Sequence, residues 1–195
     1  IELTEQHGLM PVVVLWRESK ANSRLADFLK SQGISALVNL THIQQGKKIT
    51  EDLQRLNIPM LQGIHSRHHL ADWHKATSGV AAPMTAMFIA LPETWGISDP
   101  LVLSVQEGDQ EKWLVPQVKL LLDKVVSQAQ LQNLPNEEKK LAVMFWNYPQ
   151  GQNNLSSANM NIPLSLQNIQ QALKNEGYST DDLDEQQWIE AAQQL

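Results

Sequence analysis

The stretch Thr85–Ser104, TAMFIALPETWGISDPLVLS, decides the fold that we predict for this chain. Its apolar run, Ala86–Leu91, is too short to span a membrane and suits a strand buried on both faces of a sheet. We expect a strand over 85–91 that stops at Pro92, because proline cannot donate to a sheet ladder. Glu93 would then project from the carboxyl end of a central strand, where open α/β sheets gather their ligands.

Strands and helices are expected to alternate on both sides of this stretch. In chain order, we predict a strand at 10–16, a helix at 19–32, a strand at 34–40, a short helix capped by Thr50, a strand at 58–64, a helix at 66–77, strands at 85–91 and 101–105, a helix at 113–131, a strand at 141–146 and a helix from Pro163 to Gly177. Such alternation is typical of βαβ units. The predicted fold class is α/β, a flavodoxin-like or Rossmann-like parallel sheet with flanking helices, followed by the start of a second α/β unit.

A polar segment with a proline, 134–140, interrupts this pattern and indicates a domain edge. We therefore expect an α/β domain over 1–134 and a strand-loop-helix-helix segment over 135–195. The single strand of that segment cannot form a sheet alone, so the segment either packs on the first domain or belongs to a neighbouring α/β domain. The chain begins with Ile1 and its first residues are neither a signal nor a transit peptide, so we interpret it as a piece of a longer protein.

Composition argues against several classes of function. The net charge is −6 and the basic residues are scattered, which argues against nucleic-acid binding. The sequence has no cysteine, so disulfides and thiolate metal sites are excluded, and this absence fits the cytoplasm. No apolar run reaches the length of a membrane helix, and neither a GxxxxGK[ST] nor a GxGxxG motif occurs.

Glu93 is the main candidate for chemistry. A carboxylate at the end of a central strand can act as a general base or as a transient ligand of a metal ion. The alternative is an ordinary solvated carboxylate after a strand.

Four histidines, in GIHSRHHLADWH, form a second candidate. If 66–77 is helical, His65 could share a face with His68 or His69, and imidazoles at this spacing can bind zinc, cobalt or nickel. No HExxH motif is present, and a solvated helix face is the simpler interpretation.

The segment 147–166 is a third candidate, because a glycine-containing loop before a helix can hold an anion. Gly151 is its only glycine, so an ordinary connection is favoured.

Five short motifs occur in an order that resembles a known family. They are Asn57-Ile58-Pro59-Met60-Leu61-Gln62-Gly63-Ile64, Ala90-Leu91-Pro92-Glu93-Thr94-Trp95-Gly96, Glu138-Lys139-Lys140-Leu141-Ala142-Val143, Asn161-Ile162-Pro163-Leu164-Ser165-Leu166 and Glu176-Gly177-Tyr178. Together they resemble the large, tetrapyrrole-binding subunit of cobaltochelatase, in a family that includes the H subunit of magnesium chelatase. The resemblance is firm over 57–178 and looser before it.

The resemblance implies a ligase that inserts a divalent metal into a tetrapyrrole in the cytoplasm. Cobalt or magnesium would be the substrate ion, and separate AAA+ subunits, not this chain, would hydrolyse ATP. In cobaltochelatases the tetrapyrrole is hydrogenobyrinic acid a,c-diamide, an intermediate of aerobic cobalamin biosynthesis. The alternatives are a magnesium-chelatase-like subunit acting on a porphyrin, and a non-catalytic structural or docking module. On its own, this piece is expected to be inactive.

The resemblance also implies site residues. The family's Leu-Pro-Glu is intact and makes Glu93 the catalytic candidate, whereas Trp95 stands where related proteins have an aspartate, for which Asp99 is the nearest replacement. His65, Asn161 and Ser165 are the candidates for binding substrate, although Asn161 and Ser165 could simply start a helix. No resident metal site is expected.

Overall fold

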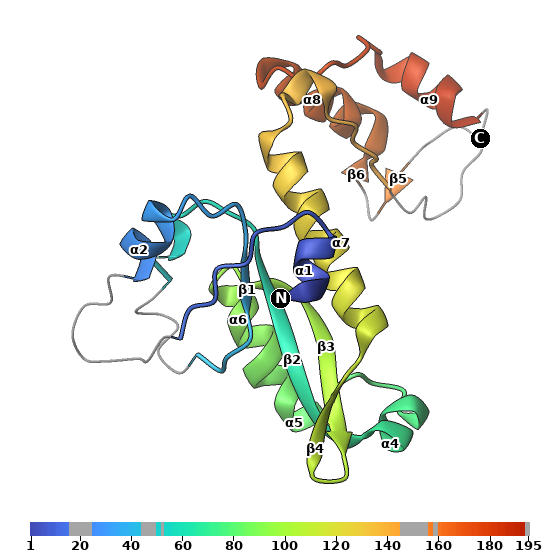
Figure 1. The fold of residues 1–195 in the computed structure, drawn as a ribbon. Coiled ribbons are helices and arrows are strands. Elements are labelled where there is room, and N and C mark those ends of the chain that lie inside the picture. Colours follow the sequence, from blue (N-terminus) through green and yellow to red (C-terminus); the bar gives the residue numbers. More distant parts are fainter. Residues whose placement is uncertain (16–24, 44–49, 52, 145–155, 158–159, 194–195) are drawn as a thin grey trace. The chain divides into compact units, whose positions relative to one another are not determined.

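The computed structural model describes residues 1–15, 25–43, 50–51, 53–144, 156–157 and 160–193 (Figure 1). These residues form two compact units, Ile1–Gln132 and Asn133–Leu195. The first unit carries a four-stranded sheet, and the second is mainly helical.

The sheet of the first unit has the strand order β1-β2-β3-β4 (Figure 1). Its strands are β1 (Leu37–Asn39), β2 (Met60–His69), β3 (Ser98–Glu107) and β4 (Gln110–Trp113). The first three strands pair in parallel, while β3 and β4 form an antiparallel hairpin around Gly108. The predicted α/β class, a mainly parallel sheet with flanking helices, is therefore confirmed.

The helices of this unit include those in the crossovers between parallel strands. In chain order they are α1 (Glu2–Gln6), α2 (Leu25–Ser31), α4 (Leu70–Lys75), α5 (Ala82–Thr85), the π-helical turn η1 (Ala86–Ala90), α6 (Leu91–Thr94) and α7 (Val115–Asn133). Of these, α4 to α6 form the connection from β2 to β3. Residues 50–51 and 53–54 are also helical. None of the helices in the described ranges is long and apolar enough to cross a membrane.

Helix α7 covers one face of the sheet. Its Leu121 and Val125 pack against Leu61 of β2 and Leu103 of β3, and all four side chains are buried. The predicted helix 113–131 is confirmed here, because its apolar residues recur every three to four positions and face one surface.

The opposite face of the sheet is covered by the segment between β2 and β3. Ile64 of β2 and Val102 of β3 belong to a second buried cluster, together with Val105 and Leu114. Partly buried side chains from α4 and η1 pack on this cluster: Leu70, Trp73, Phe88 and Ile89.

The predicted strand 85–91 is wrong, because these residues are helical. α5, η1 and α6 follow one another without a break; Pro92 is buried, and Met84, Phe88 and Ile89 are half-buried. The apolar run therefore buries one helical face instead of the two faces of a strand. The wide turn of η1 precedes Pro92, whose missing N–H leaves the carbonyl four residues earlier without its α-helical donor. The strand comes later, as β3.

The predicted helix 66–77 is also wrong in its first half. β2 continues to His69, because it pairs with β3 as far as His69↔Gln106, and helix α4 starts only at Leu70. His65 and His69 thus lie four positions apart on a strand, with a register shift between them, instead of one turn apart on a helix. Ser66 is a buried strand residue and not a helix cap.

Two further predicted strands do not form in the described residues. Residues 10–15 and 141–144 have no regular secondary structure, and the ends of these predicted strands, 16 and 145–146, lie outside the described residues. The helix predicted at 19–32 is described from Leu25 to Ser31, and the strand predicted at 34–40 is the shorter β1.

The second unit contains a short hairpin and two helices. Its elements are the 3-10 turn η2 (Asn136–Glu138), β5 (Ser156–Ser157), β6 (Met160–Asn161), α8 (Ile162–Asn175) and α9 (Glu185–Gln193). Helix α8 begins after Asn161 and is followed by Gly177 at φ 84°, as the helix predicted from Pro163 to Gly177 requires. The loop around Gly151 lies outside the described residues.

Candidate functional site

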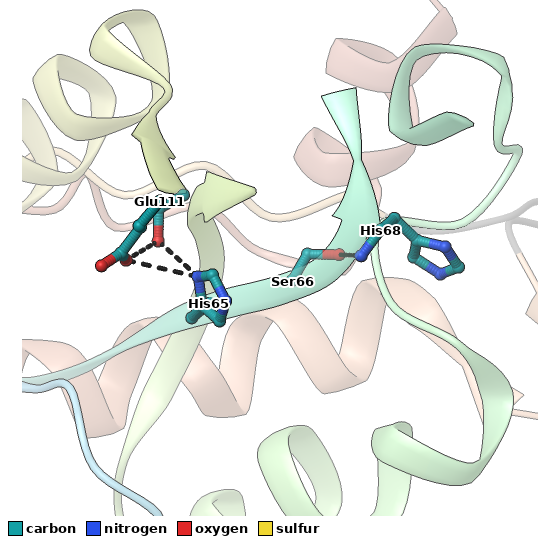
Figure 2. Close-up of polar contacts among 5 residues, drawn as sticks. His65, Ser66, His68 and Glu111 are labelled. Atoms are coloured by element: carbon teal, nitrogen blue, oxygen red, sulfur yellow. Dashed lines mark hydrogen bonds and ion pairs between the residues drawn. The ribbon is translucent and has the colours of Figure 1, made fainter. Parts of the chain in front are cut away.

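The clearest polar cluster lies across three neighbouring strands. His65 of β2 pairs in register with Ser104 of β3, and the β3–β4 hairpin brings Glu111 beside them. The His65 Nδ1 atom lies 3.0 Å from Ser104 Oγ and 3.3 Å from Glu111 Oε1, and the Ser104 hydroxyl donates to Glu111 Oε1 over 2.5 Å (Figure 2). Strand pairing therefore brings together residues that are 39 and 7 positions apart.

Exposure differs within this cluster, and the difference defines its accessible side. Ser104 is only 2% exposed. The side chains of His65 and Glu111 are 41% and 46% exposed. A ligand can therefore reach the imidazole and the carboxylate, while the hydroxyl between them is closed to solvent.

A pocket of about 260 Å³ opens beside the same part of β2. Its lining combines β2 with the segment that contains α5 and η1, namely Ile64, His65, Ser66, Arg67, His68, Val80, Ala81, Met84 and Phe88. Val80, Ala81, Met84 and Phe88 make one wall apolar, whereas Arg67 and the two histidines make the β2 wall polar. The guanidinium of Arg67 is always charged, so the pocket suits a ligand that is apolar with an acidic edge.

The histidines of β2 do not form the cluster that was expected on one face of a helix at 66–77. Figure 2 shows His65 beside Glu111, while the Ser66 hydroxyl accepts a hydrogen bond from the backbone N–H of His68 over 3.3 Å. Among the described residues, no group of three or more metal-ligating side chains lies close enough to hold a metal ion.

Glu93 lies in the first turn of α6, and its position differs from the predicted strand end. Its side chain is exposed, makes no hydrogen bond or ion pair to another described residue, and does not line the pocket. The carboxylate is thus available to a ligand, but the described part of the chain does not bring it together with His65.

The carboxylate of Asp99 already forms hydrogen bonds with side chains of the first unit. It has a positive φ of 51° near the start of β3, and its carboxylate accepts hydrogen bonds from Lys124 (2.5 Å) and Gln128 (2.8 Å) of α7. These hydrogen bonds, Lys124 first, hold the pKa of Asp99 below its ordinary value, against the opposing effect of burial. Asp99 therefore anchors α7 to β3 and is poorly suited to replace a second carboxylate beside Glu93.

Asn161 and Ser165 lie together at the start of α8, in the second unit. Asn161 Oδ1 accepts from the backbone N–H of Leu164 over 3.0 Å, which makes Asn161 the N-cap, and its Nδ2 donates to Glu185. The Ser165 hydroxyl donates to the Asn161 carbonyl over 2.7 Å. Asn161 thus caps α8 and connects it to α9 (Glu185–Gln193), while Ser165 bonds back to the start of its own helix.

Arg67, Ser104 and Glu111 are the residues that reasoning from the sequence missed. The turn at Gly108-Asp109 is visible in the sequence and predicts that β3 and β4 form a hairpin. The parallel register that sets His65 against Ser104 has no local sequence signal, because it depends on two strands separated by a long crossover.

Comparisons with known proteins place the chain in a family. The sequence profile of the CobN/Magnesium Chelatase family matches residues 1–194. An uncharacterized protein of Methanocaldococcus jannaschii is 27% identical over 94% of this chain and 17% of its own length. The aerobic cobaltochelatase subunit CobN of Pseudomonas aeruginosa is 26% identical over 90% of this chain and 16% of its own length. The chloroplastic magnesium-chelatase subunit ChlH of Oryza sativa is 27% identical over 77% of this chain and 12% of its own length.

The fold has a counterpart among solved structures. The catalytic subunit of cobaltochelatase from Mycobacterium tuberculosis superposes with a TM-score of 0.78 at 22% identity, over 99% of this chain and 18% of that one. The chain thus spans less than a fifth of the length of each of these relatives. Since the family profile covers 1–194, the chain belongs to the CobN/magnesium chelatase family.

Proposed function

We propose that this chain forms part of the tetrapyrrole-binding region of the large subunit of an ATP-dependent cobaltochelatase, which inserts cobalt into hydrogenobyrinic acid a,c-diamide for cobalamin biosynthesis. The membership of the family and the similarity to a CobN subunit support the reaction class. The observation that carries the role of this segment is the pocket beside β2, with its apolar wall and its Arg67.

The size of the pocket limits what it can hold. Its volume of about 260 Å³ lies just below the range of about 300–1,000 Å³ that is usual for sites of small-molecule ligands. A tetrapyrrole is larger than this. The pocket therefore takes one edge of the macrocycle, with an acidic substituent toward Arg67, and the rest of the longer protein holds the remainder. This division also explains why the isolated segment would be inactive.

The partners follow from the same proposal. AAA+ subunits hydrolyse ATP and drive insertion, as the resemblance to the chelatase family implies, and the absence of a GxxxxGK[ST] motif from this sequence agrees with that division. The cobalt ion is a substrate and not a resident cofactor, and the reaction takes place in the cytoplasm.

Binding of a tetrapyrrole to the complete protein that contains this segment tests the proposal. Quenching of tryptophan fluorescence measures the dissociation constant for an acidic tetrapyrrole. Replacing Arg67 by Gln removes a charge-assisted contact and should weaken binding at least about tenfold. Lys119→Gln is the matched control, because it removes one positive charge from α7 away from the pocket and should leave the dissociation constant unchanged. Equal affinities of the two variants would contradict the proposed pocket.

Glu93 is proposed to act in the insertion step, either by removing a pyrrole proton or by replacing water on the incoming metal. Its intact Leu-Pro-Glu motif and its exposed carboxylate support this role. Glu93→Gln in the complete protein should abolish insertion and leave folding and tetrapyrrole binding intact. Normal turnover by this variant would exclude the role. If Arg67→Gln also had no effect, the segment would instead be a structural or docking module.

A magnesium-chelatase activity is the second candidate, because the identity to a ChlH subunit is close to that to a CobN subunit. Assays with Co²⁺ and hydrogenobyrinic acid a,c-diamide, in parallel with Mg²⁺ and a porphyrin, distinguish the two reactions.

A further inference from the structure

The hydrogen bonds among His65, Ser104 and Glu111 indicate which nitrogen of the His65 ring carries the proton. A serine hydroxyl has one hydrogen, and in this cluster it donates to Glu111 Oε1. Ser104 Oγ can then only accept from His65 Nδ1, which lies 3.0 Å away. Nδ1 therefore carries the imidazole proton, and in the neutral ring the Nε2 atom keeps its lone pair.

This arrangement differs from the triad of a serine hydrolase. In a triad, one imidazole nitrogen faces the serine and the other faces the carboxylate. In this protein the same atom, Nδ1, faces both Ser104 and Glu111. The Ser104 hydroxyl is also almost fully buried, so it cannot attack a substrate. The serine and the glutamate instead act on the histidine together.

We propose that His65 accepts a pyrrole proton during metal insertion, and that Ser104 and Glu111 are positioning residues that hold it for this step. The inference rests on the proposed function, whose pocket His65 lines. In the step, the pyrrole N–H bond breaks and its electron pair stays on the nitrogen, which binds the divalent cation. The proton moves to His65 Nε2. Glu93 then has the other role proposed above, which is to replace water on the incoming metal ion.

The surroundings of His65 suit an acceptor. Glu111 Oε1 lies 3.3 Å from Nδ1 and Ser104 Oγ lies 3.0 Å from it, so both contacts hold the ring at the nitrogen that does not take the proton. Nε2 has no hydrogen-bond partner among the described residues, and the side chain is 41% exposed. The three groups are fixed by strand pairing, which holds a site more firmly than a loop does.

The first test removes the imidazole from the complete protein, assayed with its ATPase partners. His65→Ala should lower kcat for insertion by about 100-fold, the usual contribution of a general base, while tetrapyrrole binding is kept. Added imidazole should restore a measurable part of the rate, which a purely structural histidine would not allow. His69→Ala is the matched control from the same strand and should neither lose activity nor respond to imidazole. Absence of any rate loss in His65→Ala, or a loss that imidazole does not relieve, would overturn the proposal.

The second test asks whether Glu111 acts through His65. Glu111→Gln should lower kcat by about tenfold and leave KM unchanged. In the His65→Ala background the same change should have no further effect, because its partner is already absent. Glu107→Gln is the control. The Glu107 carboxylate lies in the same hairpin, pairs with Lys112 and does not contact His65. Additive losses in the double variant would show that Glu111 is only structural.

The outcomes separate this inference from the proposed function. If the wild-type protein fails to bind a tetrapyrrole, both are wrong. If the wild-type binds it, Arg67→Gln weakens binding and His65→Ala inserts metal normally, the pocket stands and the proton acceptor is another group.

Discussion

Among the described residues, Asp99 carries a carboxyl group whose protonation affects the stability of the first unit. Its folded-state pKa lies below the ordinary value of 3.8, chiefly because of the hydrogen bond from Lys124. The unfolded chain therefore binds the proton more readily than the folded chain. The resulting stabilisation is fully present above the ordinary carboxyl pKa and is lost as the pH falls through the lowered value.

Replacing Asp99 by Asn tests this at a single residue. Asn tolerates the positive φ of 51°, so the substitution removes the charge without straining the backbone. The Lys124 side chain is 38% exposed and solvent screens the pair, so we expect a loss of only about 1 kcal/mol in unfolding free energy at neutral pH. Urea denaturation measures the loss at neutral pH and at an acidic pH below 3.8. The loss should be smaller at the acidic pH, because the Asp99 carboxylate of the folded protein loses its charge as the pH falls. A loss that is the same at both pH values would contradict the assigned role of the charge.

Helix α8 shows what one capping residue does for a whole element. Asn161→Ala removes the acceptor for the Leu164 N–H and should destabilise the second unit by about 1 kcal/mol. Asn161→Ser should keep most of the stability, because serine is also a good N-cap, although it loses the contact of Nδ2 with Glu185. Thermal unfolding followed by circular dichroism checks both variants. If Asn161→Ser is stable but weakens tetrapyrrole binding, the amide contacts substrate as well as capping the helix.

At the scale of the molecule, each unit buries apolar side chains of its own. The core clusters around Leu61 and Ile64 belong to the first unit, while Ile162 and Leu166 are buried in the second. We therefore expect the two units to unfold in separate steps. Hydrogen exchange measured by mass spectrometry should show faster exchange in Ile1–Gln132 for Asp99→Asn and in Asn133–Leu195 for Asn161→Ala. Faster exchange across the entire chain in either variant would show that the units unfold together.

The sequence by itself was sufficient wherever the structural signal is local. The three-to-four spacing in α7 and the Asn161-Ile162-Pro163 start of α8 each predict a helix, because periodicity and capping act within a few residues. The alternation of elements was enough for the α/β class, and the ordered motifs were enough for the family.

Only the tertiary structure decided which apolar runs become strands and which polar residues meet. The run Ala86–Leu91 is helical because it packs one face on the sheet, and β2 extends through His69 because β3 is there to pair with it. For the same reason Ser104 meets His65: this contact depends on the register of two parallel strands separated by a long crossover, whereas the local turn at Gly108-Asp109 brings Glu111 to Ser104.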